Sequence, residues 1–368
     1  MMNIFFILSI LIFILLLIKF INKKYEYFIF NIIFFLIFII NIIKDNFTID
    51  LIIYNNEFLS NNYWHFEPFF IFIALVSKLL NFKFYFISSV YSLLTFYFLY
   101  KAINNFSINI NLSLLLFFLI PGMYLNTYIE MRQMLAVSIV GYTICVYTNN
   151  ENKKLRLLLV LFSILVHYSA IIFWILFILI KDIKSKNQTC MLLFISVFTL
   201  VVAFFTRIDI LLFELIKLFI KNISILSKYK GYIDQLLNNQ IEIVRGQYIK
   251  NIFFTIVGLF IGIITLISKN EKNHTMKLMT NIYHIGVIIL NLTMYMAPIS
   301  RLFYYFGIFQ IFLLPFAISK FKYTNIRFLL KLFINFIYFF IFIHGIHYID
   351  INGNYVFYNY SSYLFKRN

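Results

Sequence analysis

The chain of 368 residues contains 62% apolar and only 12% charged residues, and its mean hydropathy is +0.90. Soluble globular proteins carry about 25% charged residues, so this composition excludes a soluble fold. A transmembrane helix needs about 20 apolar residues, and the chain has room for about 10 to 12 such helices joined by short connections. A separate catalytic domain in water is therefore excluded, and any active site must lie at a membrane face.

Uninterrupted apolar runs predict helices rather than the strands of a transmembrane barrel. Residues 4–18 and 32–43 are apolar almost throughout, whereas barrel strands alternate apolar and polar residues. The run 3–20 lacks a small-residue cleavage site and is followed by further spans, so we expect it to be a first membrane helix. The predicted fold is an all-α polytopic bundle that forms a single transmembrane domain over residues 1–368.

Lysine and arginine residues collect in short connections and predict the orientation of the spans. Lys19, Lys23 and Lys24 follow the first span, so this turn should be cytoplasmic. Four later basic turns should also be cytoplasmic, and they lie at Lys101 and within residues 153–156, 269–277 and 320–331. These turns account for the net charge of +17, so we expect no nucleic-acid partner.

The alternation of spans places the remaining connections outside, namely residues 44–83, 126–132, 207–250, 297–301 and 349–368. The longest of these connections is 207–250, which we predict to be a long external loop. Within it, residues 208–225 carry apolar side chains at helical spacing with two lysines between them. This pattern predicts an amphipathic helix on the outer leaflet.

Two apolar segments do not fit a simple count of crossings. Residues 67–80 are too short for a span, so we expect an interfacial helix outside. Residues 157–180 are apolar around His167, yet basic residues flank both ends. This segment is either a re-entrant hairpin or a single span whose exit violates the positive-inside rule.

Two arginines stand at the outer entrances of spans, where a charged group is a candidate for function. Arg132 follows Glu130, and Arg301 precedes Tyr304 and Tyr305. Each arginine could simply extend to water at the interface. Alternatively, a guanidinium group offers a planar set of donors that binds phosphate bidentately, and we assign both arginines to such an anion.

His167 is the candidate general base, because the ordinary pKa of histidine lies near neutrality; the alternative is a packing histidine. The outer segment before residue 68 combines carboxylates with aromatic rings, namely Asp50, Tyr54, Trp64 and Glu67. An aromatic belt at the interface would explain the rings without any function. The alternative is sugar recognition, in which rings stack on pyranoses and carboxylates accept hydroxyl hydrogen bonds.

Several motifs of other enzyme classes do not occur in the sequence. There is no P-loop, dinucleotide fingerprint, HExxH motif or nucleophile elbow. The two cysteines, Cys145 and Cys190, lack the spacing of metal ligands. We therefore expect neither a cofactor nor a metal.

Four short motifs occur in one order along the chain. They are Glu67-Pro68, Arg132-Gln133-x-Leu135-Ala136, His167-x-Ser169-Ala170 and Arg301-x-x-Tyr304-Tyr305. Together they resemble the EpsG-like family of bacterial polysaccharide polymerases, which are Wzy-type proteins. The resemblance covers roughly residues 40–320, which is most of the chain.

The resemblance implies a metal-independent glycosyltransferase of the hexosyltransferase type, similar to GT-C enzymes, at the outer face of the bacterial cytoplasmic membrane. It would join oligosaccharide units linked to undecaprenyl pyrophosphate into O-antigen, capsule or exopolysaccharide. Its expected partners are membrane lipid, a flippase and a chain-length regulator. The implied site has His167 and Glu67 as catalytic groups, Arg132 and Arg301 as pyrophosphate-binding groups, and as sugar-binding groups Asp50, Tyr54, Trp64, Tyr304 and Tyr305.

Two other functions fit parts of the sequence. A flippase for lipid-linked oligosaccharides should show internal repeats and a charged central cavity, and the sequence displays neither. A membrane O-acyltransferase of surface polysaccharide would take its donor from the cytoplasm. Its catalytic residues should lie near the inner face or mid-membrane, which suits His167 but not the two outer arginines.

Overall fold

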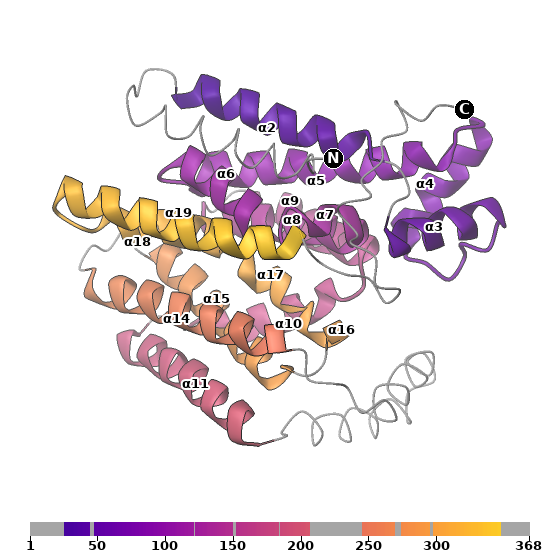
Figure 1. Cartoon of the computed structure of the whole chain (residues 1–368). Helices are drawn as coiled ribbons and strands as arrows, with labels where there is room; N and C mark the ends of the chain where they lie inside the picture. Colours follow the sequence, from indigo (N-terminus) through magenta and orange to yellow (C-terminus); the bar gives the residue numbers. More distant parts are fainter. Residues whose placement is uncertain are drawn as a thin grey trace. The chain divides into compact units, whose positions relative to one another are not determined.

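The computed structural model describes residues 26–44, 48–120, 122–149, 152–183, 185–206, 245–268, 274–294 and 297–346. All regular elements of these ranges are helices, which confirms the predicted all-α class (Figure 1). Four of the helices are long and apolar enough to cross a membrane, and they contain Phe84–Phe106, Lys186–Phe205, Ile249–Ile267 and Thr324–Ile343. The protein is therefore a multi-pass membrane protein.

Three segments considered in the sequence lie wholly or mainly outside the described residues. They are the first predicted span at 3–20, the tail at 349–368 and the external loop at 207–250 up to residue 244. The last six residues of that loop are described, and they form the first turns of helix α14 (Arg245–Ile267). The amphipathic helix expected at 208–225 stays a prediction.

The chain divides into two compact units. Unit 1 combines Met1–Trp174 with Gln310–Asn368, and unit 2 is the intervening Ile175–Phe309. The described helices of unit 1 are α2 (Glu26–Ile42), α3 (Ile49–Leu59), α4 (Pro68–Leu79), α5 (Phe84–Phe106), α6 (Ile110–Leu119), α7 (Asn126–Ile129), α8 (Met131–Thr148), α9 (Lys153–Val166), the start of α10 (Ala170–Ile180), α18 (Gln310–Ser319) and α19 (Thr324–Ile346).

Helices α5, α8 and α9 pack together in unit 1 and make its core. Helix α6 is buried on all sides, which suits the uninterrupted apolar run of its last six residues. Polar side chains within these spans bond to the backbone of their own helix. Thr95 donates to the Tyr91 carbonyl at 2.7 Å, and Thr143 donates to the Ile139 carbonyl at 2.7 Å. Such bonds satisfy hydroxyl groups where lipid and packed side chains supply no water.

The short helix α7, directly before the arginine-bearing helix α8, is held by buried polar contacts. The Lys44 ammonium donates to the Thr127 carbonyl at 2.6 Å and to the Asn41 side chain at 3.3 Å. The Thr48 hydroxyl donates to the Tyr128 carbonyl at 3.3 Å. Because α7 runs into α8, these contacts also fix where α8 begins.

Unit 2 contains the rest of α10 together with α11 (Lys186–Phe205), α14, α15 (His274–Leu292), α16 (Ala297–Ser300) and α17 (Phe303–Gly307). Helices α11, α14 and α15 pack on one another. Asn291 links two of them by donating to the Ser196 carbonyl at 3.0 Å. Helices α15 and α17 approach so closely at Gly286 that a Cβ atom there would lie 2.2 Å from Cβ of Phe306.

We expect Gly286→Ala to destabilise unit 2 by about 1–3 kcal/mol, because overpacking a close helix contact forces the backbone apart. The Cβ of Phe306 cannot rotate away, since it is attached directly to the backbone. Gly258→Ala is the matched control, because its new Cβ would meet the outer edge of the Tyr283 ring at 3.2 Å. The thermal unfolding midpoint in detergent measures both variants, and equal midpoints would contradict the tight contact.

Candidate active site

The first member of the site, Glu67, stands at the start of α4. Pro68 occupies the first helical position, where its fixed φ favours helix initiation and its missing N–H is not needed. The residue before a proline prefers extended backbone, and Glu67 has φ −65° and ψ 152°. Its side chain makes no capping bond to α4. The carboxylate is therefore free to bind residues from other helices.

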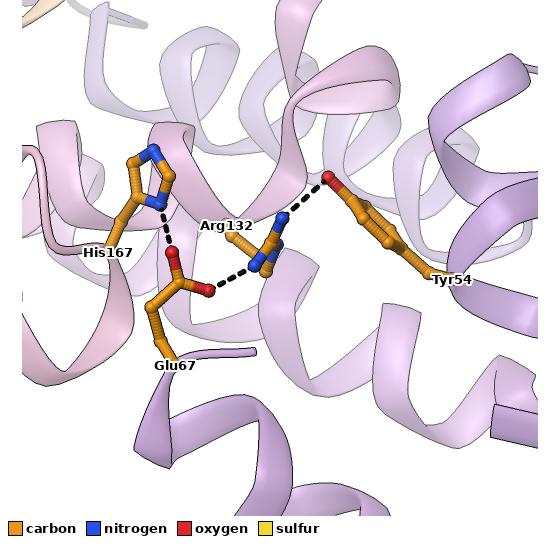
Figure 2. A network of polar contacts seen from close by, with 4 residues as sticks. All are labelled: Tyr54, Glu67, Arg132 and His167. Atoms are coloured by element: carbon orange, nitrogen blue, oxygen red, sulfur yellow. Dashed lines mark hydrogen bonds and ion pairs between the residues drawn. The ribbon is translucent and has the colours of Figure 1, made fainter. Parts of the chain in front are cut away.

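Glu67 joins Arg132 and His167, which are far apart in the sequence (Figure 2). One carboxylate oxygen lies 2.6 Å from Nδ1 of His167. The other oxygen accepts a hydrogen bond from Nη1 of Arg132, and Nη2 of the same guanidinium donates to the Tyr54 hydroxyl at 3.1 Å. We call these four residues the Glu67 cluster. It draws on α3, the start of α4, the start of α8 and the junction of α9 with α10.

Aromatic rings enclose the Arg132 guanidinium. Its central carbon lies 4.6 Å from the ring centres of both Tyr54 and Phe66, and 5.9 Å from that of Phe70. Cation–π contacts of this kind stabilise a partly desolvated cation. The Arg132 side chain is 14% exposed and that of Glu67 is 7% exposed, so their ion pair is largely shielded from water.

Arg132 has hydrogen-bond donors that Glu67 and Tyr54 do not use. A guanidinium group has five N–H donors, of which Glu67 and Tyr54 take two. Nε is buried and has no hydrogen-bond partner among the described residues. The remaining donors on the two η nitrogens can serve an anionic ligand while the ion pair with Glu67 holds the group in place.

The environment of Glu67 sets its charge state. Burial by itself raises the pKa of this carboxyl group, but the hydrogen bond to His167 and the positive charge of Arg132 outweigh burial and lower the pKa to about 2. Glu67 is therefore ionised at neutral pH, and so low a pKa makes it a weak base. Of the two groups predicted to be catalytic, the geometry favours His167 as the base.

His167 lies where the helix of residues 153–180 is interrupted. Helix α9 ends at Val166, and His167 has extended backbone with φ −155° and ψ 117° before α10 begins at Ala170. Its side chain is 24% exposed. With Nδ1 facing Glu67, Nε2 has no protein partner among the described residues and is available to a ligand.

The chain turns sharply at this interruption. Trp174 of α10 donates its indole N–H to the Ser163 hydroxyl of α9 at 2.8 Å. Eleven residues of straight helix would separate these two backbones by about 16 Å, which their side chains cannot bridge. The chain therefore turns back between Ser163 and Trp174, with His167 in the turn, and the two alternatives for residues 157–180 stay predictions.

The other predicted site residues are placed as follows. Asp50 lies in the first turn of α3, one helical turn before Tyr54. Trp64 is exposed and stacks on Tyr63 with ring centres 5.5 Å apart. Arg301, Tyr304 and Tyr305 belong to unit 2, so their predicted role beside the Glu67 cluster stays a prediction.

The sequence reading missed three residues that the structure places beside predicted ones. Phe66 and Phe70 contact the Arg132 guanidinium, and their position on either side of Glu67-Pro68 was the available signal. In unit 2, the Lys250 ammonium lies 5.6 Å from the ring centre of Tyr304. Its position 54 residues before Tyr304 in the sequence concealed the contact.

No three His, Cys, Asp or Glu side chains gather into a possible metal site within the part of the chain that the structure describes. The expected independence from metals and cofactors stays a prediction. The chemistry available from the cluster itself is that of an oriented imidazole beside a guanidinium, which is suited to proton transfer next to an anion.

The EpsG family model matches residues 27–362, which is nearly the whole chain and includes every member of the Glu67 cluster. The chain belongs to the EpsG family. This membership confirms the resemblance and supports a membrane protein of the polysaccharide-polymerase kind. No curated protein and no solved structure matches the chain, so the likeness to GT-C enzymes stays a prediction.

We expect Glu67→Gln to remove a pH-dependent part of the stability. A carboxyl group with a folded pKa of about 2, below its ordinary 4.5, stabilises the fold fully above pH 4.5. That stabilisation is lost as the pH falls from 4.5 towards 2. The difference in unfolding midpoint between the natural protein and Glu67→Gln should therefore be constant from pH 8 to 6 and shrink below 4.5.

Glu57→Gln is the control for this measurement. Glu57 lies on α3 and forms no ion pair among the described residues, so Glu57→Gln removes a carboxyl group without touching the Glu67 cluster. A midpoint difference for Glu67→Gln that is independent of pH would contradict a depressed pKa for Glu67.

Proposed function

We propose that this EpsG-family protein is a membrane glycosyltransferase that polymerises oligosaccharide units carried on undecaprenyl pyrophosphate. Family membership supports a polysaccharide polymerase in general. The single observation that carries the finer proposal is the Glu67 cluster, where an oriented histidine and an aromatic-enclosed arginine share one carboxylate. The expected site is the outer face of the cytoplasmic membrane, and the product is O-antigen, capsule or exopolysaccharide.

In the proposed reaction, Nε2 of His167 takes the proton from a hydroxyl group of the acceptor sugar. That oxygen attacks the anomeric carbon of the donor sugar, and the bond from this carbon to the diphosphate oxygen breaks. Glu67 holds the Nδ1–H of His167, which keeps the other nitrogen as the acceptor and stabilises the imidazolium that forms. The glycan has then moved to the acceptor, and the lipid diphosphate leaves with the bonding electrons.

Negative charge grows on the diphosphate as its bond to the sugar breaks, and positive charge grows on the sugar ring. Arg132 would neutralise the diphosphate through its unused η donors, strengthened by its partly desolvated surroundings. A diphosphate leaves without being protonated, so the site needs no separate acid. Arg301 is proposed as a second cation for the diphosphate.

The sugar units are proposed to bind beside the cluster. The candidates are the rings and carboxylate predicted from the sequence: Asp50, Tyr54, Trp64, Tyr304 and Tyr305. The donor reaches the site from the bilayer, which is why no soluble nucleotide-sugar domain is required. A flippase and a chain-length regulator are the proposed partners.

We expect cells carrying His167→Gln to display single repeat units in place of polymer at their surface, because a missing general base typically slows the reaction about 10²–10⁴-fold. Arg132→Lys keeps the charge but removes the bidentate fork, and should shorten the polymer through a rate loss of about 10²–10³-fold. Gel electrophoresis of extracted polysaccharide from cells carrying each variant measures chain length.

His274→Gln and Arg156→Lys are the matched controls, since both residues lie outside the cluster and should leave chain length unchanged. Full-length polymer from His167→Gln cells would contradict its role as the base.

Deletion of the gene separates the classes of function. A polymerase leaves single repeat units at the surface, whereas a flippase leaves none.

The proposed orientation predicts opposite labelling of two exposed asparagines in a variant whose exposed Cys190 is replaced by serine. Asn62→Cys in the turn before α4 should react with a membrane-impermeant maleimide in intact cells. Asn152→Cys at the start of α9 should react only after permeabilisation. The reverse pattern would place the Glu67 cluster at the cytoplasmic face.

A further inference from the structure

Unit 1 contains a cavity that no residue of the Glu67 cluster lines. Its volume is about 430 Å³, which is large enough for a phosphate group and the first part of what carries it. The cavity lies among the end of α3, the end of α4 and the start of α5. Its polar and aromatic lining includes Asn55, Phe58, Lys78, Asn81, Lys83 and Tyr85. We call it the lysine cavity.

The lining is positively charged. The Lys78 ammonium lies 4.4 Å from the ring centre of Phe58, and Lys83 is exposed. Neither lysine forms an ion pair with a carboxylate in the described ranges. The side chains of Asn55 and Asn81 add neutral hydrogen-bond donors. Two unneutralised ammonium groups beside two carboxamides favour an anion with several acceptor oxygens.

The rim of the same cavity is apolar and exposed. Leu59 and Phe82 line it and are 63% and 45% exposed. Leu79 and Leu80, which follow Lys78 in the chain, are also exposed. The candidate span Phe84–Phe106 begins directly after Lys83. In a membrane these side chains would therefore lie at the boundary between acyl chains and headgroups. A free ion bound in the cavity would leave them uncovered, whereas the chain of a lipid would cover them.

We propose that the lysine cavity binds the phosphate group of a lipid, with Lys78 and Lys83 on the phosphate and the exposed apolar side chains of the lining against the lipid chain. The ligand is either a polyprenyl phosphate or an anionic phospholipid, which present the same chemistry. Phe58 lies on α3 one helical turn after Tyr54, so such a lipid would bind next to the Glu67 cluster. The inference concerns binding alone and does not rest on the proposed polymerase reaction.

Binding of farnesyl phosphate to the purified full-length protein in dodecyl maltoside tests the proposal by calorimetric titration. The paired variant Lys78→Gln/Lys83→Gln should bind this probe at least about tenfold more weakly, because two charge-assisted contacts are lost. Lys78→Arg/Lys83→Arg should restore the affinity, since it keeps both charges. The titration is repeated in Arg132→Gln, where binding at the lysine cavity should persist.

Lys153→Gln/Lys154→Gln is the matched control, because it removes the same charge from two exposed lysines at the start of α9. A second probe, dihexanoyl phosphatidylglycerol, distinguishes the two possible lipid ligands. If it binds as tightly as farnesyl phosphate, the ligand is a phospholipid; if it binds more weakly, the ligand is a polyprenyl phosphate. Inorganic phosphate binding as tightly as either probe would overturn the assignment to a lipid. Equal affinity of the paired glutamine variant and its control would overturn the site itself.

Discussion

The carboxylate of Glu67 is the interaction on which the candidate site depends. An isolated carboxylate with 7% exposure would be strongly unfavourable at the edge of a membrane, and so would an arginine as buried as Arg132. Each group is tolerated because it neutralises the other, and the imidazole of His167 takes the second carboxylate oxygen. Removing Glu67 would leave a buried cation and an unrestrained histidine together. Glu67 thus holds both the proposed general base, His167, and the proposed diphosphate-binding group, Arg132.

The surrounding helices are organised to bring this carboxylate to its partners. Pro68 begins α4 directly after Glu67, so the carboxylate stands at a helix terminus rather than on a helix face. The contacts of Lys44 and Thr48 to α7 fix the start of α8, and with it Arg132. The interruption between α9 and α10 leaves His167 in extended backbone, partly exposed and with its Nδ1 against Glu67. Irregular backbone at three places therefore builds the site, as is common where membrane helices bind polar ligands.

The lysine cavity and the Glu67 cluster share helix α3. Tyr54 and Phe58 lie one turn apart on its buried face, the first against Arg132 and the second beneath Lys78. Both residues place an aromatic ring against a cation, and such contacts keep a cation stable while its donors remain available for a phosphate. An arrangement of this kind suits a protein that handles amphipathic anions at the boundary of the bilayer.

The sequence by itself determined the fold class, the family and the members of the cluster. Apolar runs of membrane length admit only helices, because every backbone group in lipid must be bonded within its own segment. Charged groups beside such runs are rare, so Glu67, Arg132 and His167 could be singled out without a structure. Only the tertiary structure brought them together, since their contacts join residues 65 and 100 positions apart. It also revealed the rings around Arg132, the turn at His167 and the lysine cavity, because long-range packing leaves no periodic signal in the order of residues.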